Sequence, residues 1–567
     1  MPNDPLLLQL LRGTGLFTEA QVATFAAAER AEGETVGRAV ARLGLAGEEE
    51  FLRAAASLLG MEYLPVADLE ARRELVDRLP AHTAAQYDVA PVRDDGGTLV
   101  VVTCDPFDAR LLDGLRVACG CPVDAVVCAS EDVGKFVRKC YGVGAAALDK
   151  MIKEGRYEAD DAADFSKFDV GSEEGQEAAI VRFVNSVIAE ADRQGATDIH
   201  IEPMEHELRI RYRIDGMLHK VDVPPQLQKV QAAVISRIKV MSNLDIAEKR
   251  LPMDGRIGIH ANGKEIDIRV STCPVPYGES ISLRLLQKSG AVVRFSDLGM
   301  GARDHKVIDR TIHRPNGILL VTGPTGSGKS TSLYAFLHEI NTIDKRIMTA
   351  EDPIEYEMPG IVQTAVRADI GLTFARLLRS FLRQDPDVMM VGEIRDGETA
   401  QIAVQASLTG HLVFSTLHTN DAASAFARLT DMGVEPYLIA SSVAAVLAQR
   451  LIRRLCPSCK GEVRPDPESL RGMDLDPALF EGRTLRGPVG CEKCGKSGYK
   501  GRGAIFEVLG VSEGIQSLVT SRAPSGDIKD LAMKEGMTTL RDDGWRKVFE
   551  GFTTIDEVLR VTEDQSE

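Results

Sequence analysis

The sequence predicts an α/β protein of several domains, and three observations lead to this fold class. At 567 residues the chain is too long for a single hydrophobic core. An apolar run, Ile318–Val321, is followed by a glycine-rich turn and then by helical spacing from Thr331 to Ile340. Strand-like and helix-like segments continue to alternate over residues 298–454, as a parallel sheet requires.

The glycine-rich turn has the spacing G-x-x-x-x-G-K-S between a strand and a helix. In this pattern the loop's N–H groups face phosphates, Lys329 reaches the β- and γ-phosphates, and the Ser330 hydroxyl holds Mg²⁺. We therefore expect the chain to bind ATP with Mg²⁺. The residues expected to hold the nucleotide are Gly323, Pro324, Thr325, Gly326, Ser327, Gly328, Lys329, Ser330 and Thr331.

Acidic residues follow two further apolar runs of this core. Glu393 comes directly after the run Val388–Val391, where an acid can hold Mg²⁺ or its water shell. The segment Glu351–Glu355 supplies three carboxylates and a stiffening proline, which suits a group that orients the attacking water. The spacing alone leaves a solvated acidic loop as the alternative for this segment.

Two histidines, His411 and His418, stand at the two ends of one short apolar run. A single histidine in such a place is usually structural. Two histidines near a nucleotide site are also suited to contact the phosphates and respond to their state. The residues alone leave both interpretations open.

The rest of the chain divides by composition. Helical periodicity in the first 60 residues gives way to a small α/β part, and an acidic, polar stretch follows. Alternating runs at 198–202, 208–214 and 265–270, with turns at Asp215-Gly216 and Asn262-Gly263, then predict an α+β domain. The expected divisions are an N-terminal domain at 1–145, a linker at 146–176, the α+β domain at 177–290, the core at 298–454, a cysteine-bearing element at 455–500 and a helical C-terminal part at 501–567.

Charge and hydropathy restrict the function. The formal net charge of −17 argues against a nucleic-acid partner, because such binding needs clustered lysine and arginine. The sequence has no apolar stretch long enough to span a membrane and no secretory signal, which predicts a cytoplasmic protein. A nucleic-acid translocase is therefore a weaker alternative. The intact acids Glu355 and Glu393 argue against a module that uses ATP only as a switch.

Four of the ten cysteines form two C-x₂-C pairs separated by 31 residues. Two such pairs can close a tetrahedral site for a structural Zn²⁺, with no open position for catalysis. The expected zinc ligands are Cys456, Cys459, Cys491 and Cys494. The other six cysteines are expected to be small buried hydrophobic residues.

Three motifs of the core resemble the Asp, Walker B and His boxes of secretion ATPases, the family that drives type II secretion and type IV pilus assembly. They are Glu351-Asp-Pro-Ile-Glu355, the segment Arg383–Asp396, and the segment Thr409–Asp421 with both histidines. The resemblance covers about residues 176–567. It implies a RecA-like core that assembles as a homohexamer. It also implies that Glu355 activates water, Glu393 is the Walker B acid, and His411 and His418 contact the nucleotide.

The resemblance implies further that the domain before the core donates two arginines, Arg269 and Arg284, to the phosphates. A guanidinium that arrives from a mobile domain neutralises transition-state charge only when the domain closes. The segments Gln401–Gly410 and Met432–Pro436 are closer to the type II secretion branch than to pilus extension motors. Pilus assembly is the alternative function.

The N-terminal domain resembles that of these motors only loosely. Some of them bind cyclic di-GMP through motifs that begin Arg-Leu-Gly, but Leu6 and Thr35 stand where the two first arginines are needed. Arg42-Leu43-Gly44 is present out of register. We therefore expect this domain to dock to an inner-membrane protein of the secretion complex rather than to bind a signalling nucleotide. The chain would then meet the membrane only indirectly.

Overall fold

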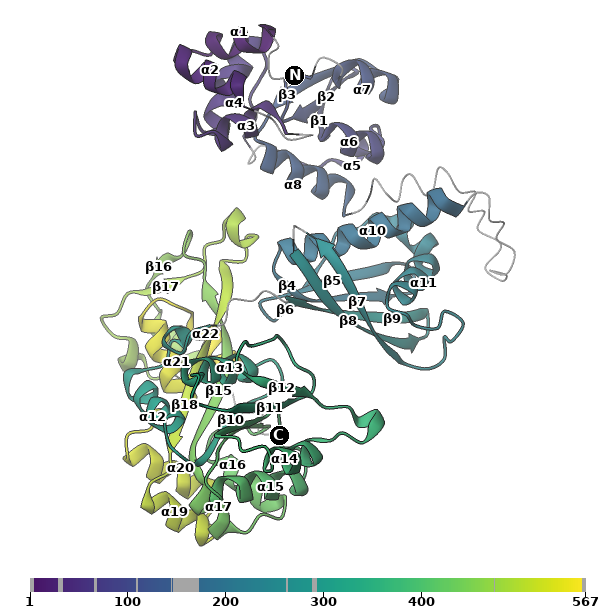
Figure 1. Cartoon of the computed structure of the whole chain (residues 1–567). Coiled ribbons are helices and arrows are strands. Elements are labelled where there is room, and N and C mark those ends of the chain that lie inside the picture. Colours follow the sequence, from purple (N-terminus) through teal and green to yellow (C-terminus); the bar gives the residue numbers. More distant parts are fainter. Residues whose placement is uncertain are drawn as a thin grey trace. The chain divides into compact units, whose positions relative to one another are not determined.

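A computed structural model of the chain describes residues 5–28, 34–65, 69–108, 111–143, 145, 173–261, 264–287, 293–473 and 475–562. It forms two compact units, Met1–Gln287 and Lys288–Glu567, and each is described by itself (Figure 1). Most of the predicted linker and the predicted turn at Asn262-Gly263 lie outside the described residues. Within the described residues, no helix is long and apolar enough to cross a membrane.

The first unit begins with short helices and a small sheet, as the sequence predicts. The first four helices enclose an apolar cluster that includes Phe25, Phe51 and Leu52. Strand β2 then pairs antiparallel with β1 and parallel with β3. The elements are α1 (Pro5–Gly13), α2 (Glu19–Ala27), α3 (Val36–Arg42), α4 (Glu48–Leu59), α5 (Arg73–Val76), α6 (Ala81–Tyr87), β1 (Val89–Asp95), β2 (Thr98–Thr103), α7 (Leu111–Cys119), β3 (Val123–Val127) and α8 (Ser130–Tyr141).

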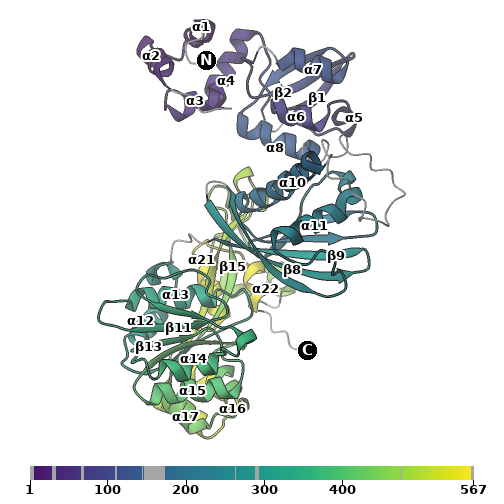
Figure 2. The ribbon, with the colours of Figure 1, turned by 45° about the vertical axis from the view of Figure 1, so that its right-hand side comes forward.

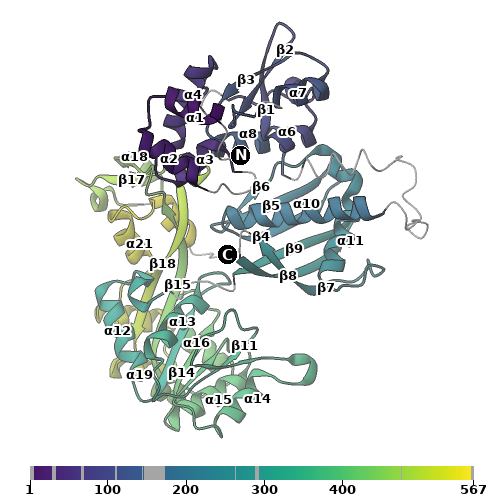
Figure 3. The same cartoon turned by 45° about the horizontal axis from the view of Figure 1, so that its top comes forward.

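The same unit continues with a six-stranded antiparallel sheet in the order β6-β5-β4-β9-β8-β7. Helices α10 and α11 pack on one face of this sheet, where Phe183 and Ile238 meet inward residues such as Ile199 (Figure 3). The alternate residues of each strand point to the other face. The elements are α10 (Glu173–Arg193), β4 (Ala196–Pro203), β5 (Leu208–Ile214), β6 (Met217–Lys220), η3 (Pro225–Val230), α11 (Gln231–Met241), β7 (Met253–Ala261), β8 (Lys264–Val275) and β9 (Gly278–Gln287).

Two details of this part differ from the prediction. The apolar spacing of the sequence predicts a helix from Ala178 to Gly195, whereas helix α10 begins at Glu173 and ends at Arg193. The sequence also predicts one helix from about Pro225 to Met241, but this segment is divided into a 3-10 turn and α11. Val230, the last residue of the turn, leaves the helical region with a ψ of 11°.

The second unit is organised around a seven-stranded sheet in the order β12-β11-β13-β14-β10-β15-β18. All neighbouring pairs are parallel except β15 with β18. The elements that build this core are η4 (Phe295–Leu298), α12 (Ala302–Ile312), β10 (Gly317–Thr322), α13 (Lys329–Ile340), β11 (Ile347–Glu351), β12 (Val362–Ala365), η5 (Ala368–Ile370), α14 (Phe374–Phe381), β13 (Val388–Val391), α15 (Gly397–Leu408), β14 (Leu412–Leu417), α16 (Ser424–Asp431), α17 (Pro436–Ser442) and β15 (Val443–Leu455).

The central strand β10 is buried on both faces, which explains its continuous apolar run. Leu319 and Val321 pack with α12 and α13, whereas Ile318 and Leu320 pack with α14, α15 and α16. Figure 2 shows α12 and α13 on one side of the sheet and α14 to α17 on the other. The predicted parallel α/β core is confirmed.

The C-terminal part contains a strand that the sequence analysis does not anticipate. Strand β18 (Tyr499–Gly510) pairs with β15 along most of its length and forms one edge of the sheet. The other elements of this part are β16 (Gly461–Val463), α18 (Pro467–Gly472), η6 (Pro477–Phe480), β17 (Leu485–Gly487), η7 (Glu492–Cys494), α19 (Glu513–Thr520), α20 (Ser525–Lys534), α21 (Leu540–Phe549) and α22 (Ile555–Thr562).

Candidate active site

The glycine-rich turn joins β10 to α13 at the carboxyl end of the central strand. Gly323, Gly326 and Gly328 have φ angles of 150°, 80° and 88°, which glycine adopts without strain. A Cβ atom on Gly323 would lie only 2.6 Å from Gln449 O and from Ser327 Oγ. The close packing of this loop therefore requires glycine at its first position.

Lys329 is the first residue of α13 and folds back over the loop. Its Nζ donates hydrogen bonds to Gly323 O at 2.9 Å and Pro324 O at 3.0 Å. Burial lowers the pKa of Lys329, and the carboxylate of Glu393 acts in the opposite direction. An ammonium held by two neutral carbonyls can exchange them for phosphate oxygens, with which it forms stronger, charge-assisted bonds.

Two hydroxyl groups of the loop fit a nucleotide with Mg²⁺. Ser327 Oγ is buried and has no hydrogen-bond partner among the described residues. Such an orphaned group costs free energy unless a ligand satisfies it. Ser330 is exposed one residue after Lys329, where its oxygen is free to meet a hard cation.

Glu393 stands directly beyond β13, next to the histidine at the end of β14. Arg395 Nη2 lies 2.5 Å from Glu393 Oε1, and His418 Nε2 lies 3.4 Å from Oε2. Burial raises the pKa of Glu393, but the bonds from Arg395 and His418 outweigh it, so the pKa lies below its ordinary value. The carboxylate stays ionised at neutral pH, which suits a metal or water contact better than proton donation.

Arg395 is a site residue that the sequence analysis does not identify. Its only local signal is its position two residues after Glu393 in a turn. The bond to Glu393 raises the pKa of Arg395, and Asp352 adds to this effect.

The acidic segment after β11 separates into two roles. Glu351 is buried, and its Oε1 accepts hydrogen bonds from Thr349 Oγ1 at 2.6 Å and Gln363 Nε2 at 3.0 Å. Tyr334 Oη donates to the other oxygen of Glu351 and accepts from the Glu355 backbone N–H at 3.2 Å. Glu351 is thus engaged within the protein, whereas the side chain of Glu355 is exposed. Of these two glutamates, Glu355 is the one placed to meet a substrate.

The two histidines lie at opposite ends of β14. His418 follows the end of β14, whose last residue, Leu417, pairs with Thr322. Thr322 directly precedes the glycine-rich turn, residues 323–330, which we call the phosphate loop. His411 precedes the strand, and its Nδ1 lies 2.9 Å from Ala406 O at the end of α15. Six strand residues separate them by about 20 Å. Within one chain, therefore, only His418 lies at the end of β14 beside the glycine-rich turn, and the expected nucleotide contact of His411 remains a prediction.

The two predicted arginines are cross-strand neighbours in the first unit. Arg269 on β8 is opposite Arg284 on β9, and Arg284 Nε donates to Asp198 Oδ1 at 3.0 Å. The register extends the row to Arg256 on β7 and to Arg213 on β5. Laterally paired residues share a face of a sheet. Four arginines and one aspartate therefore form a positively charged row, of which the sequence analysis identifies only the inner two arginines.

The four cysteines of the two C-x₂-C pairs converge, with all four Sγ atoms within 4.8 Å of one another. The sulfurs of Cys456 and Cys491 are 3.8 Å apart, as are those of Cys459 and Cys494. A tetrahedral zinc with Zn–S bonds of about 2.3 Å needs sulfurs about 3.8 Å apart. The Gly498 N–H also donates to Cys494 Sγ at 3.3 Å. The geometry fits a structural zinc and, with four thiolates, leaves no position for a substrate.

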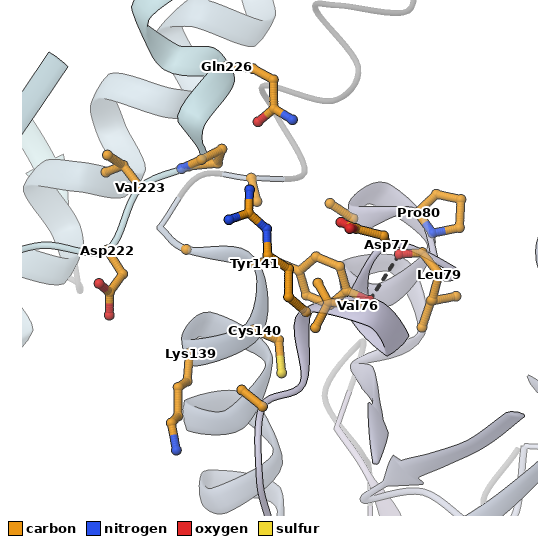
Figure 4. Close-up of a pocket in the computed structure, with 16 residues that line it drawn as sticks. Val76, Asp77, Leu79, Pro80, Lys139, Cys140, Tyr141, Asp222, Val223 and Gln226 are labelled. Carbon is orange, nitrogen blue, oxygen red and sulfur yellow. Dashed lines mark hydrogen bonds between the residues drawn. The ribbon is translucent and has the colours of Figure 1, made fainter. Parts of the chain in front are cut away.

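A separate pocket lies in the first unit (Figure 4). The end of α8 contributes Lys139 and Tyr141, and the segment before η3 contributes Asp222 and Val223. Tyr141 Oη donates to Leu79 O at 3.0 Å. None of the residues predicted for the nucleotide or the metal lines this pocket.

Two family models match the chain. The model of the type II/IV secretion system protein family matches residues 173–560, which include the phosphate loop, Glu393, both histidines and the arginine row. The chain belongs to this family. The MshEN domain model matches residues 59–147, so the α/β part of the N-terminal domain has a closer relation to a known domain than its motifs suggest.

Curated relatives carry two functional names. Type II secretion system protein E of Pseudomonas aeruginosa is 51% identical over 393 residues, 69% of this chain and 77% of that protein. The corresponding protein of Xanthomonas campestris is 42% identical over 528 residues, 92% of each chain. The type IV pilus assembly ATPase PilB of Myxococcus xanthus is 39% identical over 557 residues, 98% of each chain.

Proposed function

We propose that this protein hydrolyses ATP to drive protein export through a type II secretion system. The observation that carries the proposal is the phosphate loop with ionised Glu393 and His418 together at one edge of the sheet, in a member of this family. The chain is an ATPase of the secretion family. The 51% identity over 393 residues to a type II secretion system protein E favours export as the work that is done.

Each residue of the site has a role in this reaction. Lys329 and the loop N–H groups hold the triphosphate, while Ser330 and Glu393 would hold Mg²⁺, which neutralises charge on the phosphates. Glu355 takes a proton from the water that attacks the γ-phosphorus, and the bond from that phosphorus to the leaving ADP oxygen breaks. His418 is positioned beside Glu393 to respond to the loss of the γ-phosphate.

The arginine row supplies the remaining charge in this proposal. Arg269 and Arg284 reach the phosphates when the first unit closes over a nucleotide held in a homohexamer. A planar guanidinium matches phosphate oxygens and stabilises the charge that develops in the transition state. Opening of the contact after hydrolysis would convert chemistry into displacement.

The N-terminal domain would hold the motor at its place of work. We propose that it docks to an inner-membrane protein of the secretion complex, so that a cytoplasmic ATPase acts at the membrane. Zinc at the four cysteines would hold the small β16–β17 element onto the core. A fragment that begins at Gln176 should keep ATP hydrolysis and lose secretion in cells; normal secretion by this fragment would contradict the docking role.

Type IV pilus assembly is the second candidate. It is favoured by the match to the Myxococcus xanthus protein over nearly the whole chain, including the N-terminal domain. The deciding experiment is deletion of the gene in its host, followed by complementation with the intact chain or with Lys329→Ala. Restored export of proteins without a change in surface pili supports the first function, and restored pili without export supports the second.

A further inference from the structure

A polar segment of β15 packs directly against the phosphate loop. Gln449 and Arg450 follow the last residue of β15 that pairs with β10, so they lie beside the turn rather than beside the strand. A Cβ atom on Gly323 would lie 3.1 Å from Arg450 Nη1, and one on Gly328 would lie 2.7 Å from Gln449 Nε2. Two glycines of the phosphate loop thus rest on these two side chains.

Gln449 connects this segment to the helix that begins with the loop. It is buried, and its Oε1 accepts a hydrogen bond from Ser332 Oγ at 2.7 Å. Ser332 lies in the first turn of α13, three residues after Lys329. Gln449 therefore links the end of the phosphate loop to the first turn of α13.

Arg450 connects the same loop to the turn that follows the site histidine. Its Nη2 donates to Asn420 O at 2.8 Å, and its Nη1 donates to Gln449 O at 3.1 Å. Asn420 comes two residues after His418, whose ring lies beside Glu393. One guanidinium thus contacts both the phosphate loop and the chain segment that holds His418.

The charge of Arg450 has no direct counter-ion in the described part of the chain, where its hydrogen-bond partners are backbone carbonyls. Burial lowers the pKa of Arg450, although Glu507 and Asp421 act in the opposite direction. Burial also lowers the pKa of Lys329, and the positive charge of Arg450 adds to that shift. Two neighbouring cations repel each other beside one loop, and a bound triphosphate would relieve the repulsion.

Other hydrogen bonds hold the turn after His418 but do not involve the phosphate loop. Thr419 N donates to Thr322 Oγ1 at 2.9 Å, and Ala422 N donates to Glu507 Oε1 at 2.9 Å. The turn is therefore anchored at both sides, and Arg450 holds its middle residue. Of these anchors, Arg450 is the charged one that also lies against Gly323.

We propose that Arg450 is a positioning residue for ATP hydrolysis. It holds the phosphate loop and the turn after His418 at a fixed distance from each other, so that His418 and Glu393 meet the γ-phosphate. This inference rests on the proposed ATPase function. The guanidinium acts through His418 and is not assigned a contact with the substrate.

The test uses the full chain and compares Arg450→Ala with Arg454→Ala, an exposed arginine of the same strand. Arg450→Ala should lower kcat for MgATP by up to about tenfold, because it acts through His418 and should cost no more than removal of that ring. The KM for ATP and the affinity for a fluorescent ADP analogue should change by less than about threefold. Arg454→Ala should match the wild type.

A double-mutant cycle with His418→Ala separates positioning from general support of the fold. If Arg450 acts through His418, the double variant should be no slower than His418→Ala alone. Independent effects, which multiply, would overturn the proposal. So would an unchanged kcat, or a loss of ADP-analogue binding as large as the loss of kcat.

Two further arms keep the test decisive. If Arg450→Ala does not fold, Arg450→Gln keeps the first three carbons of the side chain and an amide donor without the charge, and the same kcat and KM criteria apply to it. Arg450→Lys keeps the charge and one donor, and should recover part of kcat. Absence of ATP hydrolysis in the wild type would refute the proposed function itself, whereas a wild type that hydrolyses ATP at the same rate as Arg450→Ala would refute only the role of Arg450.

Discussion

The carboxyl ends and the amino ends of the parallel strands in the ATPase sheet contain similar residues, but these residues differ in what they can do. The carboxyl ends form the carboxyl edge of the sheet, and the amino ends form the opposite edge. At the carboxyl edge, Lys329, Glu393 and His418 lie beyond three parallel strands and meet around the phosphate loop. At the opposite edge, His411 is bonded to the end of α15 and is about 20 Å from that loop. A residue's chemical type is therefore informative only together with the end of the strand at which it stands.

The largest effect should come from the centre of the carboxyl edge. Lys329→Ala removes the ammonium that holds the phosphates and should weaken ATP binding by about a hundredfold or more. Binding of a fluorescent ATP analogue measures this, with Lys306→Ala on the exposed side of α12 as the control. Near-normal binding by Lys329→Ala would contradict the site.

The acidic segment Glu351–Glu355 sharpens the comparison, because it contains both an exposed residue that we assign to the reaction and a buried residue that is bonded within the protein. Glu355→Gln and Glu393→Gln should bind ATP and lower kcat by about a hundredfold. Glu351→Gln should instead lower the free energy of unfolding by about 1–3 kcal/mol, since it disturbs two buried hydrogen bonds and one that is partly buried. Steady-state kinetics and thermal unfolding distinguish the two. Normal turnover in Glu355→Gln would show that another group activates water.

The arginine row tests whether the first unit takes part in the chemistry. Arg269→Ala and Arg284→Ala should each lower kcat by about tenfold or more and raise KM only modestly, since the contact matters most in the closed state. Arg256→Ala should have a smaller effect of the same kind. The control is Arg209→Ala, whose partner on the same sheet is Glu202. Equal effects for all four would indicate a non-specific effect of charge.

The histidines test the comparison directly. His418→Ala should lower kcat by about tenfold, whereas His411→Ala should leave kcat within about twofold and lower stability by about 1 kcal/mol. The two expected effects follow from the partner of each ring, because His418 lies beside Glu393 and His411 lies beside Ala406 O. A larger kinetic effect at His411 would mean that a neighbouring subunit uses it.

The smallest effect on turnover should come from the cysteines. The protein should contain one zinc per chain, and Cys456→Ser should lose it and lower the melting temperature, while kcat per folded molecule stays unchanged. Elemental analysis and thermal unfolding measure the two outcomes, with Cys273→Ser, an exposed cysteine of the first unit, as the control. Unchanged metal content after replacement of all four cysteines would refute the zinc assignment.

Much of the site could be predicted because its determinants are local in sequence. The phosphate loop needs glycines at a fixed spacing between a buried strand and a helix, and the two cysteine pairs have a spacing typical of zinc sites. The exposed position of Glu355 and the burial of Glu351 could not be predicted, because both lie in one short acidic segment. Their difference depends on Tyr334 and Gln363, which come from other elements.

The sequence by itself determined that the chain carries a glycine-rich loop between a strand and a helix, an acid directly after a second buried strand, and two cysteine pairs, because each depends on neighbours only a few residues away. Only the tertiary structure decided that His418 meets Glu393, that His411 does not, that Arg256 and Arg213 extend the arginine row, and that Arg450 lies behind the loop. These relations depend on strand order and register, which join residues as distant in sequence as Asp198 and Arg284, 86 positions apart, through hydrogen bonds that no local pattern encodes.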